Sequence, residues 1–124
     1  MTIIEAINRI DHLKPNAYSQ QDKVRWLSNL DGVVKKEIID THEGGEDVIF
    51  EGYNDNTLLT TELLIPAPYD GVYVRYLEMQ IDYANGEYAK YNNSTVEYNT
   101  AFSAFEKYYN RDHTPRSRGS RFLF

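Results

Sequence analysis

The chain of 124 residues contains no cysteine, so neither a disulfide framework nor a thiolate metal site can form. Its first stretch, MTIIEAINRIDHLK, lacks the basic start and apolar run of a signal peptide. No stretch approaches the roughly 20 apolar residues that a membrane-spanning helix needs. We therefore expect a soluble intracellular protein that has no membrane partner.

Motifs for metal, phosphate and nucleophilic chemistry are also missing. The densest polar stretch is DTHEGGED, residues 40–47, but it has neither the HExxH pattern nor calcium-loop spacing. Its Gly-Gly pair lacks the lysine and following helix of a phosphate-binding loop. A solvated acidic loop is the favoured interpretation, with no metal and no cofactor.

Three acids between residues 70 and 82 are candidates for general acid–base chemistry: Asp70, Glu78 and Asp82. Such chemistry needs a group in a cleft with a shifted pKa. Glu78 and Asp82 stand four residues apart, which predicts a like-charge pair on a wet helix face. We expect no enzymatic activity; a small enzyme built on the acids of residues 40–47 is the alternative.

Charge is distributed unevenly along the chain. Residues 1–110 hold nine basic and 18 acidic side chains, a net charge of −9, whereas residues 111–124 hold four basic and one acidic, a net of +3; together they give −6. An acidic body is a poor match for a phosphate backbone. Only the basic C-terminal tail has the charge to meet nucleic acid or an acidic protein surface.

Two helices are predicted in the first third of the chain. Thr2 and Glu5 form a capping box before an isoleucine-rich stripe, and Pro15 ends that stripe, which predicts a helix over residues 3–13. Ser19 is a suitable N-cap for a second helix from residue 20 to about residue 40. Gly32 lies inside this helix and indicates a close contact or a break.

The middle of the chain reads as irregular. Residues 44–68 alternate short apolar runs with turn residues, which predicts extended segments or a hairpin. A helix apolar on nearly every side follows, with Asp70 as a possible N-cap, and Asn85-Gly86 ends it. Such a helix lies either inside the fold or between subunits.

A last helix is predicted over residues 87–110, because aromatic residues recur there at alternating spacings of three and four. The seam consists of Tyr88, Tyr91, Thr95, Tyr98, Phe102, Phe105 and Tyr109. The predicted fold is therefore mainly α: a small bundle of about four helices with a short extended or hairpin insertion. The domain spans residues 1–112, with the insertion at 44–68 and an extended docking tail at 113–124.

Tyrosine is unusually frequent, with 11 copies. A buried tyrosine hydroxyl needs a polar partner, and a small core cannot supply so many. Some tyrosines are therefore expected at contacts between subunits. The predicted interface residues are Tyr73, Tyr76, Tyr83, Tyr91 and Tyr98.

The tail HTPRSRGSRFLF combines arginines with an apolar end. Arginine forms bidentate bonds with carboxylates, and a terminal Phe-Leu-Phe can anchor in an apolar groove. We expect this tail to dock on a partner rather than to hang free. The predicted partner-binding residues are Arg116, Arg118, Arg121, Phe122, Leu123 and Phe124.

In this order of elements the chain resembles the small head–tail adaptor, or connector, proteins of tailed bacteriophages and prophages. About half of the chain carries the resemblance, in three stretches: YSQQDKVRWLSNLDGVVKKEIIDTHEG, LLIPAPYDGVYVRYLEMQIDYANGEYAKYNNS and FSAFEKYYNRDHTP. The resemblance implies a structural, non-catalytic virion protein of the neck, assembled in the bacterial cytoplasm.

The resemblance further implies a homo-oligomeric ring, typically of twelve copies, beneath the portal protein. The ring would extend the DNA channel used in packaging and ejection, let DNA pass without specific binding, and join a downstream stopper or tail protein. The tail would bind the portal, and the acids Glu43, Glu46 and Asp47 would line the lumen or face the phage tail. The main alternative is a small nucleic-acid-binding regulator that uses the tail arginines on phosphate.

Overall fold

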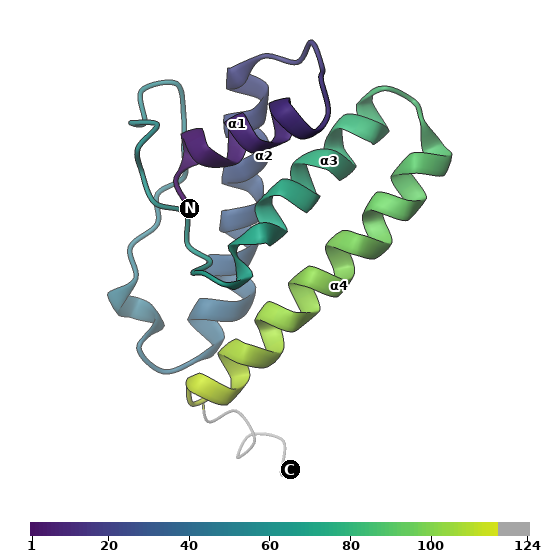
Figure 1. The fold of residues 1–124 in the computed structure, drawn as a ribbon. Helices are drawn as coiled ribbons and strands as arrows, with labels where there is room; N and C mark the ends of the chain where they lie inside the picture. The colour runs from purple at the N-terminus through teal and green to yellow at the C-terminus, as the bar shows by residue number, and fades with distance from the viewer. Residues whose placement is uncertain (117–124) are drawn as a thin grey trace.

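The computed structural model describes residues 1–116 as a bundle of four α-helices. The helices are α1 (Ile3–Leu13), α2 (Gln20–Val33), α3 (Val72–Ala84) and α4 (Tyr88–Asp112). Figure 1 shows α3 and α4 as an antiparallel pair, with α1 and α2 on the other side of α3. The predicted small helical bundle is confirmed.

The helix starts follow the predicted capping chemistry. Glu5 N donates to Thr2 Oγ1 at 3.2 Å while Thr2 N donates to Glu5 Oε1 at 2.8 Å, which completes the capping box of α1. Asp22 N donates to Ser19 Oγ at 3.1 Å at the start of α2. The prediction for Asp70 was wrong: Gly71 is the N-cap of α3, and Asp70 pairs with the amino group of Met1 at 3.3 Å.

The second predicted helix changes its geometry towards its end. α2 continues through Gly32 to Val33, and a π-helical turn (Val34–Ile38) and a 3-10 turn (Ile39–Thr41) follow. The widened turn lets the consecutive Ile38 and Ile39 both be buried, each 4% exposed. This π-helical turn leads directly into the acidic loop.

Residues 44–68 form no hairpin, and residues 1–116 contain no β-strand. Apart from the 3-10 turn Gly45–Asp47, the segment is irregular. Its later part pairs with the N-terminus instead of with itself: Ile3 N donates to Thr61 O, and Leu63 N to Met1 O, both at 3.0 Å. Those bonds satisfy backbone groups that a hairpin would have paired internally.

The hydrophobic core is centred on α3, which contacts each of the other three helices. Its buried residues meet the isoleucine stripe of α1 and the leucines of α2 on one side and Phe105 of α4 on the other. The sequence left open whether this apolar helix lies inside the fold or between subunits. The structure places it inside the fold. α4 packs against α3 (Figure 1), and the side chains in the first half of α4 are largely exposed.

Candidate functional site

The chain that leaves α4 turns back onto the segment that follows α2. Two backbone hydrogen bonds join them, from Glu43 N to Thr114 O at 2.8 Å and from Arg116 N to Thr41 O at 2.9 Å. We call residues 40–46 and 113–116 the C-terminal clasp. The clasp fixes the point on the surface from which the rest of the tail continues.

The Arg116 side chain reinforces the clasp. Its Nε donates to the carbonyl oxygen of Asp40 at 2.7 Å, and its Nη2 donates to Glu46 Oε2 at 2.6 Å. A backbone amide and then the Arg116 guanidinium lower the pKa of the Glu46 carboxyl. Two residues that were predicted separately, a tail arginine and a loop acid, therefore meet in one subunit.

Gly45 marks the tightest point of the clasp. A Cβ atom at this position would lie 2.4 Å from the carbonyl oxygen of Ile39, which no side chain can occupy. Lys35 covers the same turn, since its Nζ donates to Gly45 O at 2.8 Å and pairs with Asp40. Gly45 thus serves close packing of the backbone, whereas Gly44 adopts the left-handed conformation with φ of 86°.

His42 lies at the buried centre of the clasp. Its Nδ1 is 2.6 Å from Ile38 O and its Nε2 is 2.8 Å from Asn110 Oδ1. The ring packs edge-on against Tyr109 with 4.8 Å between centroids, and Tyr109 stacks on His113 at 3.8 Å. His42 therefore joins the π-helical turn after α2 to the end of α4, and both of its ring nitrogens have hydrogen-bond partners.

The acids of the predicted loop face solvent. Glu43, Glu46 and Asp47 are exposed. In the part of the chain that the structure describes, no three histidine, aspartate or glutamate residues gather closely enough to hold a metal ion. Of the predicted partner-binding residues, only Arg116 lies within the described part; Arg118, Arg121, Phe122, Leu123 and Phe124 lie outside it.

The predicted interface tyrosines occupy different environments. Tyr73 is 0% exposed, so its side chain cannot contact another subunit in this fold, and its hydroxyl is used inside the core. Tyr76 and Tyr98 are half-buried and pack on each other between α3 and α4, with centroids 5.3 Å apart. Tyr83 is 58% exposed and packs beside Tyr91 at 5.2 Å.

Sequence reasoning missed the outer face of the first half of α4. This face carries no charge over four turns and includes Val96, which is 64% exposed. Its members are Ala89, Asn92, Asn93, Val96, Asn99, Thr100 and Ser103. Their helical spacing and lack of charge were visible in the sequence, but the aromatic seam dominated the interpretation of this helix.

Asp31 forms a buried polar cluster that the sequence did not reveal. Its carboxylate accepts hydrogen bonds from Tyr53 Oη at 2.5 Å, Tyr73 Oη at 2.6 Å and Leu64 N at 3.0 Å. Tyr73 Oη in turn accepts from Ile65 N at 2.7 Å. Burial raises the pKa of Asp31 although these hydrogen bonds oppose the rise. The cluster fastens the irregular segment to α2 and α3.

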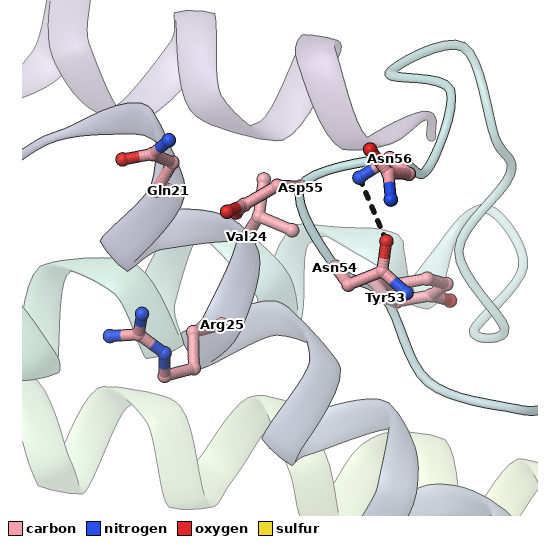
Figure 2. A pocket seen from close by; sticks show the side chains of 7 residues that line it. All are labelled: Gln21, Val24, Arg25, Tyr53, Asn54, Asp55 and Asn56. Atoms are coloured by element: carbon pink, nitrogen blue, oxygen red, sulfur yellow. Dashed lines mark hydrogen bonds between the residues drawn. The ribbon is translucent and has the colours of Figure 1, made fainter.

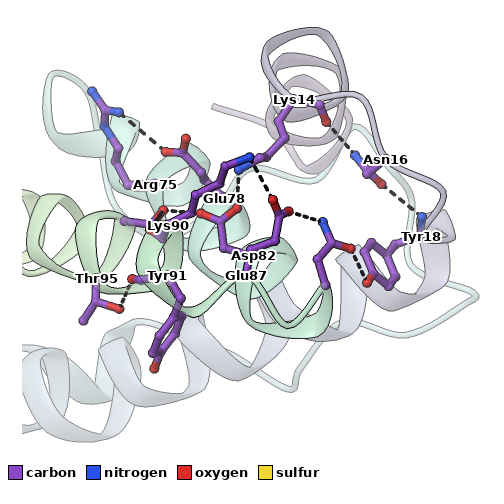
Figure 3. A network of polar contacts seen from close by, with 12 residues as sticks. Lys14, Asn16, Tyr18, Arg75, Glu78, Asp82, Glu87, Lys90, Tyr91 and Thr95 are labelled. Atoms are coloured by element: carbon purple, nitrogen blue, oxygen red, sulfur yellow. Dashed lines mark hydrogen bonds and ion pairs between the residues drawn. The ribbon is translucent and has the colours of Figure 1, made fainter.

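The prediction of an exposed Glu78–Asp82 pair was wrong for Asp82. Its side chain is 1% exposed, pairs with Lys14 and accepts a hydrogen bond from Ser94. Glu78 lies one turn away, with Oε1 3.7 Å from Nη1 of Arg75. Figure 3 shows this network, which joins α1, α3 and the start of α4. The acid is buried because a lysine 68 residues away in sequence supplies its partner.

A polar hollow lies between α2 and the turn at residues 53–56 (Figure 2). It has a volume of about 340 Å³. Its lining consists of Gln21, Val24, Arg25, Tyr53, Asn54, Asp55 and Asn56. Tyr53 gives its hydroxyl to Asp31, and the other polar groups are exposed.

The fold and the clasp define this chain as a small helical-bundle protein in which residues 113–116 are held against the segment that follows α2. Comparisons with protein-family models, with curated proteins and with solved structures find no match. Among residues 1–116, no helix combines the length and apolar character that crossing a membrane requires.

Proposed function

We propose that this chain is a structural head–tail connector of a tailed bacteriophage, which forms a homo-oligomeric ring beneath the portal and extends the DNA channel. The observation that carries the proposal is the C-terminal clasp. It presents the basic, Phe-tipped tail from a fixed point at the end of α4, as a docking arm requires. Preorganising the base of an arm lowers the entropy lost on binding.

The outer face of α4 supports the oligomeric part of the proposal. The cores of protein interfaces are depleted in charge and enriched in tyrosine. The face that includes Val96 has no charge, and Tyr88 in the first turn of α4 is 62% exposed. In a chain with a net charge of −6, an uncharged face favours contact between like subunits.

Co-assembly with a portal protein tests the proposal directly. A portal protein from the genome that encodes this chain would be mixed with the full chain and with a chain that ends at residue 116. Complexes would be separated by size. The full chain should form a ring-sized complex, whereas the shortened chain should not. Equal binding of both chains would contradict a docking role for the tail.

Salt and DNA distinguish the regulator alternative. A DNA-binding tail should give an affinity that falls steeply with salt and does not change on Phe122→Ala. A portal-binding tail should lose affinity on Phe122→Ala, with DNA irrelevant. The described clasp already engages one arginine with Glu46, which leaves two arginines for phosphate contacts.

A further inference from the structure

The irregular segment presents an exposed surface that is both acidic and apolar. Ile49 is 82% exposed and Leu58 is 75% exposed, the two most exposed large apolar side chains among residues 1–116. A pocket of about 290 Å³ opens beside Ile49. Its lining includes Ile49, Phe50, Glu51, Glu62 and Leu64. We call residues 47–51, with this pocket, the acidic–apolar face.

Two acids of this face, Asp47 and Glu51, are exposed. Neither Asp47 nor Glu51 takes part in an ion pair within residues 1–116. Glu46, the acid that precedes them in the chain, already pairs with Arg116. The pairing of tail arginines with loop acids therefore begins at the clasp, and the acids that could continue it lie next in sequence.

The sequence of the tail supplies arginines to pair with the acids of this face and aromatic residues to cover its apolar side chains. After Arg116 come Arg118, Arg121 and then Phe122-Leu123-Phe124. A wider groove of about 580 Å³, lined from α1 and α3, has Arg9, His12 and Arg75 beside Leu13 and Val74. It would repel the tail arginines, so charge selects the acidic–apolar face over this groove.

Chain length allows the contact within one subunit. From Glu46 to Glu51 is five residues, a span of at most roughly 18 Å even if fully extended. Residues 117–124 can span up to about 26 Å from Arg116. The tail is therefore long enough to reach the face from the anchor that the Arg116–Glu46 bond provides.

We infer that, in the free subunit, residues 117–124 dock on the acidic–apolar face of their own chain. Arg118 and Arg121 pair with Asp47 and Glu51, and the terminal aromatic residues cover Ile49 and enter the adjacent pocket. Because the contact is intramolecular, the length of the chain between Arg116 and the docked residues sets the effective concentration of the tail at this face. The inference deepens the proposed function, on which one consequence rests: the tail must leave this face before it can enter a portal.

A single spin label locates the tail in the full chain. Because the protein has no cysteine, Ser120→Cys gives one labelling site. The amide spectrum of the labelled chain would be compared with that of the same sample after reduction of the label. We expect loss of most of the signal intensity at residues 47–51 and around Leu64. Unchanged intensity there, or loss centred on another face, would overturn the inference.

Matched charge variants test the pairing. Glu51→Lys should restore much of the lost intensity, as should the double variant Phe122→Ala/Phe124→Ala. Glu106→Lys changes charge equally at an exposed position of α4 and should leave the broadening unchanged. If Glu51→Lys and Glu106→Lys behave alike, charge does not select this face and the inference fails. Both lysine variants lie at exposed positions, and their spectra elsewhere report that the fold is intact.

Mixed samples distinguish docking within a subunit from exchange between subunits. Isotope-labelled chain without the spin label would be mixed with unlabelled chain that carries it. Broadening of residues 47–51 in this mixture would show that the tail docks on another copy, which contradicts the inference. Portal co-assembly separates the two proposals: if Glu51→Lys frees the tail yet no variant binds the portal, the proposed function fails while the docking stands.

Discussion

The guanidinium of Arg116 donates a 2.6 Å hydrogen bond to the carboxylate of Glu46, a residue 70 positions earlier in the chain. This bond joins the end of the bundle to the loop that follows α2. Both side chains are partly exposed, 41% for Arg116 and 66% for Glu46. An exposed pair of this kind adds little to global stability, so its effect is local: it fixes where the tail starts.

Arg116→Ala should therefore open the clasp without unfolding the bundle. The backbone amides of residues 43 and 116 donate the two hydrogen bonds of the clasp. In the variant these two amides should therefore exchange their hydrogens faster than in the wild-type chain. The melting temperature should stay nearly unchanged. Hydrogen exchange followed by NMR measures the first effect, and a thermal unfolding scan measures the second. Arg25→Ala, which removes the exposed pair with Asp22, is the matched control and should leave clasp exchange as it was.

Loss of Asp31 should destabilise the whole fold. Asp31→Ala leaves two tyrosine hydroxyls and the amide of Leu64 without their acceptor in the core. Each buried donor left unpaired costs about 1–3 kcal/mol, so the total loss should be at least about 3 kcal/mol. Denaturant unfolding measures it. A loss below about 1 kcal/mol would contradict the assignment of this cluster as a structural centre.

The raised pKa of Asp31 also predicts a pH dependence of stability. Burial raises its pKa in the folded state above the ordinary value near about 3.9. The folded state therefore binds the proton more tightly, and this group adds stability as pH falls through the folded pKa, with the full gain below the unfolded pKa. Relative to Asp31→Asn, the wild-type chain should gain stability on acidification across that window. A difference that is constant with pH would refute the shift.

Lys14 should matter more than an exposed lysine. Lys14→Met leaves the buried carboxylate of Asp82 with Ser94 alone, and breaking a buried pair by removing one partner costs about 3 kcal/mol. Lys90→Met, which removes an exposed partner of Glu87, should change stability very little. The double variant Lys14→Met/Asp82→Asn should recover part of the loss. Thermal unfolding of the wild-type chain, Lys14→Met, Asp82→Asn and the double variant gives the coupling between the two residues.

Local signals in the sequence predicted the helices well. The capping box of Thr2 and Glu5, the Ser19 cap and the Gly86 turn act over a few residues, and the structure confirms them; Gly86 has φ of 73°. These signals need no knowledge of distant partners. The number of helices and the mainly α class follow from them.

The features that sequence reasoning missed depend on distant partners. Asp82 is buried because Lys14 meets it, and Tyr73 is buried because Asp31 and Ile65 N use its hydroxyl. Residues 59–63 pair with the N-terminus rather than forming a hairpin. In each case composition and periodicity are compatible with both outcomes, and only the tertiary contact decides between them.

The α4 face offers a test of the predicted ring contact. Val96→Lys places a charge at the centre of the uncharged face and should prevent ring formation with the portal while leaving the subunit folded. Leu13→Lys is the matched control, since Leu13 is also an exposed aliphatic residue of similar exposure, 57% against 64%, but lies on α1. Size measurement of portal complexes separates the two variants. Equal behaviour would remove α4 from the interface.

The central claim is that many copies of this chain surround the DNA channel of a tailed particle. Cryo-electron microscopy of the neck of tailed particles produced by the genome that encodes this chain tests it most directly. The proposal predicts a ring of this four-helix bundle beneath the portal, with the C-terminal tails inserted into it. A neck that is complete and contains no copy of this chain would contradict the claim.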